Sequence, residues 1–206
     1  MILHLDEHLV VADKPAGLPT VPGRPAELHD CLWQRVRAQV ADALVVHRLD
    51  MATSGLVLFA RGPEAQRRLS AAFAQRAVDK RYEAVVAGRV AQDKGEIDLP
   101  LAADWPNRPR QQVDVERGKP SLTRWRVLAH DDAAGATRLA LKPLTGRSHQ
   151  LRVHLAAIGH PILGDALYAT PEGAAAAPRL LLHATQLAFA HPADGRTVSF
   201  ATPAPF

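Results

Sequence analysis

The chain has 206 residues, of which 47% are hydrophobic and 22% are charged, proportions that are ordinary for a globular protein with a sizeable core. The formal net charge of +4 favours an anionic partner, and the single cysteine excludes an intrachain disulfide and fits a reducing cytoplasm. No apolar run reaches the roughly 18 residues of a membrane-spanning helix, and the first residues lack the pattern of a signal peptide.

The first part of the chain predicts two strands, a proline-rich turn and a helix. Residues 2–5 and 9–12 have the short apolar runs of strands. The prolines within residues 14–25 force an extended, turning path, because proline fixes φ and disfavours helix before it. Residues 28–40 have the apolar spacing of a helix, with Trp33 expected in the core.

A polar segment then lies between two apolar runs, residues 45–46 and 56–59, each of which resembles a buried strand. This segment carries His47, Arg48 and Asp50. Catalytic and binding residues are often found in loops between rigid elements. An ionised carboxylate beside a desolvated region costs free energy unless it is paired with an opposite charge. We therefore interpret Asp50 as the residue that carries out the chemistry.

The rest of the chain predicts further helices and strands, with no repeat and no long linker. A helix is expected from Pro63 to about Arg76, with Leu69 on its inner face. The proline- and arginine-rich residues 105–110 are expected to form an ordered loop. Strand patterns cover residues 82–87, 95–101, 122–128, 138–141, 180–183, 186–190 and 197–200. This order predicts a mixed α+β domain built on a large sheet.

A helix expected from Ser148 to Ile158 carries a second charged residue of interest. Leu151, Leu155 and Ile158 form its buried stripe, and Arg152 lies one position off that stripe. Arg152 is therefore expected at the edge of the core, where it can reach a partly buried carboxylate.

Several ordered segments resemble the RluA family of RNA pseudouridine synthases. The motif that resembles the family's catalytic motif is His47-Arg48-Leu49-Asp50 followed by Thr53-Ser54-Gly55. The other matching segments are residues 13–18, 80–88, 145–154, 159–165 and 181–184, with His191-Pro192 further on. The resemblance covers nearly the whole chain, and residues 104–109 look most like the RluA subgroup itself.

The resemblance implies the pseudouridine synthase fold, a large mixed and mainly antiparallel sheet flanked by helices. It also implies a single catalytic domain over residues 1–206, with no N-terminal S4-like RNA-binding domain. The expected activity is that of a stand-alone, monomeric isomerase acting without guide RNA on 23S rRNA and on the tRNA anticodon stem-loop. We expect no cofactor, because the reaction breaks the N1–C1′ bond, turns the uracil and joins C5 to C1′ with no net change in atoms or electrons.

The resemblance assigns the chemistry to three residues. Asp50 is the expected nucleophile, and attack at C1′, attack at C6 and assistance to a glycal intermediate all remain open. Arg152 is expected to pair with Asp50 and keep it ionised. Tyr82 is expected to line the uracil pocket and to take part in deprotonation of C5.

Basic residues are expected to contact the RNA. The target base must leave its stack at a cost on the order of a few kcal/mol, and Arg48 is expected either to fill the vacated place or to pair with a neighbouring acid. His47 is expected to hydrogen-bond the loop that bears Asp50. The basic stretches from Arg61 to Arg89 and from Arg108 to Arg126 indicate a phosphate-tracking face. The further candidate RNA contacts are Lys14, Lys80, Arg108 and Arg147.

Other functions fit the sequence less well. A synthase of the same fold acting on another rRNA uridine is the nearest rival. The intact set of Asp50, Tyr82 and Arg152 argues against a non-catalytic RNA-binding module, and no second acid in a comparable motif supports a glycoside hydrolase. The ten histidines match no zinc signature, so no metal site is predicted.

Overall fold

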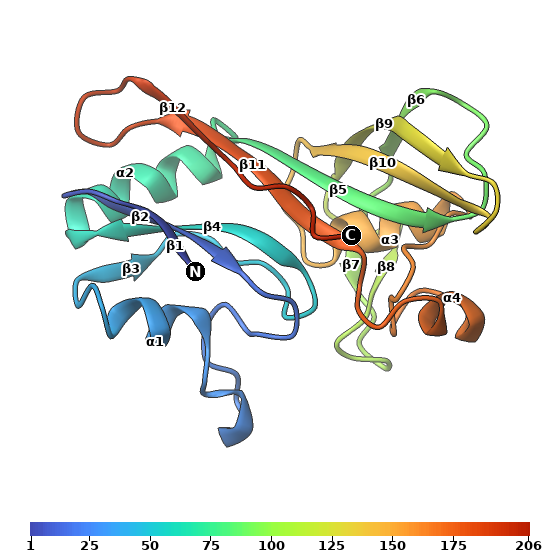
Figure 1. Ribbon diagram of the computed structural model, residues 1–206, viewed down its shortest axis with the longest axis horizontal. Helices are drawn as coiled ribbons and strands as arrows, with labels where there is room; N and C mark the ends of the chain where they lie inside the picture. The colour runs from blue at the N-terminus through green and yellow to red at the C-terminus, as the bar shows by residue number, and fades with distance from the viewer. The chain divides into compact units, whose positions relative to one another are not determined.

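The computed structural model describes residues 1–206, the side chain of Glu27 excepted, and divides into two compact units (Figure 1). The first unit comprises residues 1–80 and 183–205, and the second comprises residues 81–182 and Phe206. Each unit has a β-sheet and its own helices, which confirms the α+β class. Among the described residues, no helix is long and apolar enough to cross a membrane. The single catalytic domain expected over residues 1–206 stays a prediction.

The first unit is built on a mixed sheet. Its elements are β1 (Ile2–Leu5), β2 (Leu9–Lys14), the 3-10 helix η1 (Ala26–Leu28), α1 (Leu32–Arg37), β3 (Ala43–Val45), β4 (Ser54–Arg61), α2 (Gly62–Ala74), β11 (Leu182–Ala190) and β12 (Thr197–Ala201). The sheet order is β1-β2-β4-β11, with β3 paired to β4 and β12 paired to β11. All of these pairs are antiparallel except β4 and β11, which run parallel.

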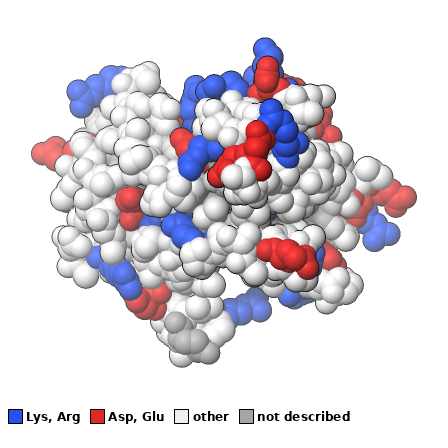
Figure 2. Space-filling model, turned by 45° about the vertical axis from the view of Figure 1, so that its right-hand side comes forward, with Lys and Arg blue, Asp and Glu red and all other residues white. Residues whose placement is uncertain are grey.

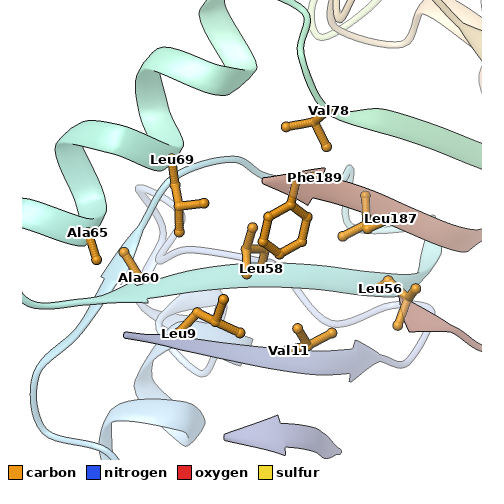
Figure 3. Close-up of a cluster of buried hydrophobic side chains, with 10 residues drawn as sticks. All are labelled: Leu9, Val11, Leu56, Leu58, Ala60, Ala65, Leu69, Val78, Leu187 and Phe189. Atoms are coloured by element: carbon orange, nitrogen blue, oxygen red, sulfur yellow. The ribbon is translucent and has the colours of Figure 1, made fainter. Parts of the chain in front are cut away.

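A hydrophobic core lies between α2 and this sheet (Figure 3). Leu56, Leu58 and Ala60 alternate along β4, so they face the same side, where Ala65 and Leu69 of α2 meet them. The residues between them on β4 are also buried, so this strand has both faces covered. The loop of residues 46–53 therefore leads directly into a rigid, buried strand.

The helix expected over residues 28–40 is shorter in the structure. The backbone at Cys31 is extended, with φ of −148°, and this separates η1 from α1. The helix expected from Pro63 to about Arg76 is confirmed as α2, with Leu69 in the core.

The second unit is built on an antiparallel sheet and a separate hairpin. Its elements are β5 (Asp79–Ala87), β6 (Lys94–Asp98), β7 (Leu101–Ala103), β8 (Gln111–Val113), β9 (Leu122–Asp131), β10 (Ala136–Pro143), α3 (Gln150–Ala157) and α4 (Pro171–Ala175). The sheet order is β5-β10-β9-β6, and β7 pairs with β8.

Most predicted strands are confirmed, with two differences in extent. The run predicted over residues 95–101 is split into β6 and β7, which lie in different sheets, and Pro100 between them lacks the N–H that a sheet ladder needs. The runs predicted at 180–183 and 186–190 form one strand, β11, because residues 184 and 185 continue its extended backbone.

Candidate active site

Asp50 lies in the loop of residues 46–53 between β3 and β4, which we call the catalytic loop, and it is half-buried. The neighbouring Leu49 is held by the buried side chain of Thr20. That hydroxyl donates to the Leu49 carbonyl at 2.8 Å and accepts from its N–H at 3.1 Å. The N–H of Thr53 donates to the Asp50 carbonyl at 3.1 Å and closes the turn. Sequence reasoning missed Thr20, because a threonine in a proline-rich segment gives no signal of so distant a partner.

Lys14 is fully buried, whereas the sequence predicted a contact with RNA. Its ammonium donates to the carbonyls of Pro15 at 3.0 Å, Leu18 at 2.7 Å and Met51 at 3.0 Å. The N–H of Gly17 donates to the same Met51 carbonyl at 2.9 Å. The predicted RNA contact is corrected to a structural role, because a buried ammonium needs acceptors inside the protein. Lys14 joins the proline-rich turn to the catalytic loop.

The end of the catalytic loop is fixed by β11. Ser54 Oγ lies 2.7 Å from Nδ1 of His183, and both side chains are buried. Gly55 has φ of +110°, and a Cβ at this position would lie 2.3 Å from the carbonyl oxygen of Ala184. Only glycine fits such a close approach of two backbones. The sequence motifs around residues 54 and 183 are thus two halves of one structural feature.

His47 ties the start of the catalytic loop to β4. Its Nε2 accepts from the N–H of Leu58 at 2.9 Å, and its ring stacks on Phe73 with centroids 4.4 Å apart. Burial, followed by the charge of Lys80, lowers the pKa of His47 to about 3, so the ring is neutral and Nε2 can accept. Burial and the charge of Arg76 lower the pKa of Lys80. The hydrogen bond expected within the loop is therefore made to the neighbouring strand.

Arg48 is exposed and takes part in no ion pair among the side chains that the structure describes. This argues against the alternative in which Arg48 pairs with a neighbouring acid. Arg48 lies two residues before Asp50, and the backbone between them is held through Leu49.

In the second unit, Arg152 is 5% exposed and so lies deeper than the predicted edge of the core. Its Nε and Nη2 donate to the two carboxylate oxygens of Asp165, both at 2.7 Å. Asp165 also accepts from the N–H groups of Leu167 at 2.9 Å and Tyr168 at 3.2 Å. A bidentate pair fixes the plane of the guanidinium. Sequence reasoning missed Asp165 as a partner, and the predicted pairing of Arg152 with Asp50 stays a prediction.

The helix that carries Arg152 is fastened to the sheet by polar side chains of its own motif. It begins at Gln150, two residues later than predicted, because His149 has a left-handed backbone with φ of +55°. Gln150 Nε2 donates to the hydroxyl of Thr123 at 3.0 Å, and Nδ1 of His154 lies 2.9 Å from the same hydroxyl. The expected burial of Ile158 is wrong, since that side chain is 36% exposed at the end of the helix.

Tyr82 lies near the start of β5, opposite Leu141 of β10, and is half-buried. Ala84 and Val86, on the same face of the strand, are fully buried. Tyr82 therefore lies where the buried part of this face begins, and its role toward uracil stays a prediction.

Two predicted RNA contacts of the second unit lie at its surface. Arg147 precedes α3 and is half-buried, and its Nε donates to the Pro120 carbonyl at a long 3.4 Å. Arg108 is exposed in the turn between β7 and β8, where its guanidinium lies 3.6 Å from the ring centroid of Trp105.

The two basic stretches differ in how far their charges are neutralised. In the first stretch, acidic partners are found for Arg61, Arg67, Arg68 and Arg89. In the second, Arg124 pairs with Glu96, while among the described residues no ion pair involves Arg108, Arg110, Arg117, Lys119 or Arg126. Figure 2 shows basic and acidic side chains side by side at several places on the face that it draws. A phosphate-tracking face is thus better supported for the second stretch.

The histidines of the matched motifs have partners within the protein. His160 Nδ1 lies 2.9 Å from the Ala87 carbonyl, and Nε2 of His191 lies 3.1 Å from the carboxylate of Asp6. Within the described part of the chain, no group of three or more His, Cys, Asp or Glu side chains could hold a metal ion.

Comparison with known proteins gives a consistent result. The family model for RNA pseudouridylate synthases matches residues 8–157. The dual-specificity RNA pseudouridine synthase RluA of Pasteurella multocida (strain Pm70) is 50% identical over 205 residues, covering 100% of this chain and 93% of that protein. The protein of the same name from Escherichia coli (strain K12) is 50% identical over 206 residues, covering 100% and 94%. The structure of human RNA pseudouridylate synthase domain containing 1 superposes with a TM-score of 0.83 at 31% identity, covering 100% of this chain and 83% of that one.

Proposed function

This chain belongs to the RNA pseudouridylate synthase family and is an isomerase that acts on RNA, and we propose that it converts uridine to pseudouridine in two RNAs, 23S rRNA and the tRNA anticodon stem-loop. The identity of about half of all residues to dual-specificity enzymes, over the full chain, supports this choice of substrates. We further propose that it works in the cytoplasm as a monomer, without guide RNA.

The observation that carries the proposal is the fixed backbone on both sides of Asp50. Leu49 is held by Thr20, and Met51 is held by Lys14 and Gly17. A nucleophile must reach its target within a narrow range of distance and direction, so a loop held from two sides suits this work. Asp50 is our proposed nucleophile, and attack at C1′, attack at C6 and a glycal route all start from its ionised carboxylate.

The other roles are assigned by motif. Arg152 is proposed to keep Asp50 ionised, and the bidentate contact with Asp165 supports this role because it holds the guanidinium in one plane. Arg48 is proposed to replace the extruded base in the RNA stack, supported by its exposure. Tyr82 is proposed to contact the uracil and to assist loss of the C5 proton, while N1 of the detached base regains a proton. The net change is then an isomerisation.

The test is to map pseudouridine in rRNA and tRNA from cells with the gene, without it, and with Asp50→Asn in its place. We expect one 23S rRNA site and one class of anticodon-loop sites to disappear together without the gene, and to stay absent with the variant. Loss of a different rRNA site alone would favour the rival synthase. Full modification in cells that lack the gene would favour a non-catalytic binding module.

A further inference from the structure

The turn between β7 and β8 (Figure 1), residues 104–110, which we call the hairpin tip, exposes a large aromatic ring. Trp105 is 66% exposed, whereas Trp125 is 7% exposed. The guanidinium of Arg108 lies 3.6 Å from the Trp105 ring centroid and covers one face of the ring. Most of the remaining ring surface contacts water, where its capacity for stacking is unused.

The hairpin tip is ordered by its own hydrogen bonds. The carboxylate of Asp104 accepts from the side-chain amide of Asn107 at 3.0 and 3.1 Å. The backbone N–H groups of Asn107 and Arg110 donate to the carbonyls of Asp104 and Asn107 at 3.1 and 3.0 Å, and the N–H of Asp104 donates to the Arg110 carbonyl at 3.0 Å. Pro106 and Pro109 fix two further φ angles. The exposed ring therefore belongs to a preformed turn.

The charge of the hairpin tip favours an anionic partner. Arg108 and Arg110 are both exposed, and neither forms an ion pair among the described residues. The acid in the turn, Asp104, is engaged by the amide of Asn107. An exposed aromatic ring beside cations that lack carboxylate partners is the combination with which proteins bind single-stranded nucleic acid, through base stacking and phosphate contacts.

The hairpin is linked to the surroundings of Arg152 through Tyr168. The Tyr168 hydroxyl accepts from the N–H of Gln111, the first residue of β8, at 2.8 Å, and it lies 2.6 Å from Nδ1 of His149. The guanidinium groups of Arg110 and Arg152 lie 5.3 and 5.0 Å from the centroid of the Tyr168 ring. The base of the hairpin and Arg152 thus share one aromatic residue within the second unit.

We propose that Trp105, backed by Arg108, is a stacking platform for one unpaired nucleobase of the substrate RNA loop, and that Arg110 contacts a phosphate beside it. The proposal rests on the proposed function for its choice of RNA. It assigns Trp105 to binding and positioning of the RNA and gives it no part in the bond changes.

The test measures binding of an anticodon stem-loop RNA with 2-aminopurine placed at one loop position at a time. With the wild-type protein and with Trp105→Phe, stacking should quench the fluorescence at one loop position other than the target. With Trp105→Ala that quenching should be lost and the Kd should rise about 5- to 100-fold. Val115→Ala, which shortens another exposed side chain (79% exposed) of the same unit, should bind like the wild type. A fully paired duplex should bind the wild type and Trp105→Ala equally.

Equal Kd and equal quenching for Trp105→Ala and the wild type would overturn the platform, as would failure of the wild type to bind the stem-loop. A change in oligomeric state of Trp105→Ala, with RNA binding unchanged, would overturn it in favour of a protein interface. Product formation is followed in the same samples. Position-specific quenching without pseudouridine would support the platform and contradict the proposed function. Normal product formation and normal binding by Trp105→Ala would contradict the platform and support the proposed function.

Discussion

The catalytic loop and the hairpin tip are both short and polar, yet they are held in different ways. The catalytic loop is anchored by buried groups from distant segments, namely Thr20, Lys14 and β11. The hairpin tip is ordered by hydrogen bonds among its own residues and exposes its largest side chains. This difference fits the two proposed roles, because reaction chemistry needs a carboxylate in a fixed position, whereas RNA contact needs an accessible surface.

The sharpest test of this division replaces the carboxylate itself. Asp50→Asn keeps the size of the side chain and removes its charge, so we expect product formation to fall at least ~1,000-fold while the midpoint of thermal unfolding stays unchanged. Pseudouridine formation on a stem-loop RNA and a thermal melt check both parts. Substantial activity in this variant would remove Asp50 from the proposed role.

The next test compares Lys14, the buried cation that anchors the catalytic loop, with Arg108, an exposed cation of the hairpin tip. Lys14→Met leaves carbonyls without their buried donor, so we expect the free energy of unfolding to fall by about 3 kcal/mol. The matched variant Arg108→Met should change it by no more than about 0.5 kcal/mol. Urea unfolding of both proteins measures the contrast, and equal stabilities would show that the ammonium of Lys14 does not anchor the loop.

A smaller effect is expected from the dependence of the free energy of unfolding on pH through His47. The pKa of His47 is about 3 in the folded chain, so between pH 3 and its ordinary value of 6.5 the unfolded chain binds a proton that the folded chain does not. The contribution of neutral His47 to the free energy of unfolding is therefore fully present above pH 6.5. It is lost as the pH falls toward 3, by up to about 1.4 kcal/mol per pH unit. His47→Gln keeps an acceptor for Leu58 and should flatten the slope. Parallel urea-unfolding profiles from pH 7.5 to 4.5 would contradict this assignment.

The smallest effect concerns salt. Replacing Arg110 with alanine should weaken RNA binding a few-fold at low salt and reduce the slope of log K against log salt by about 1, because one phosphate contact is lost. Titrations at several salt concentrations, with Arg124→Ala as the control in which the cation is already paired with Glu96, measure the difference. Equal slopes for the wild type and the Arg110 variant would argue against phosphate contact by the hairpin tip.

Hydropathy patterns predicted elements of both units, such as the strand 2–5 and the helix starting near Pro63 in the first and the strands 122–128 and 138–141 in the second, because these depend on local periodicity. The family resemblance, and not hydropathy, is the source of the roles proposed for Asp50 and Arg152. Neither predicted the burial of Lys14, because a lysine in a proline-rich loop usually points into solvent.

The partners that sequence reasoning missed are contacts between separate segments. Arg152 and Asp165 are 13 residues apart, and Ser54 and His183 are 129 apart. Each pair leaves no repeat in hydropathy, and its members appear in the sequence as unrelated polar residues. A matched motif indicates that a residue is constrained but does not name its partner.

The parallel pairing of β4 with β11 also sets an order of events during translation. Ser54 and Gly55 leave the ribosome long before His183 and Ala184 are synthesised. A nascent chain of the first 80 residues has the whole catalytic loop but lacks the strand against which Gly55 packs. The contacts of Ser54 and Gly55 with β11 therefore form only after almost all of the chain has been made, whereas Thr20, Lys14 and Gly17, which hold Leu49 and Met51, are present from the start.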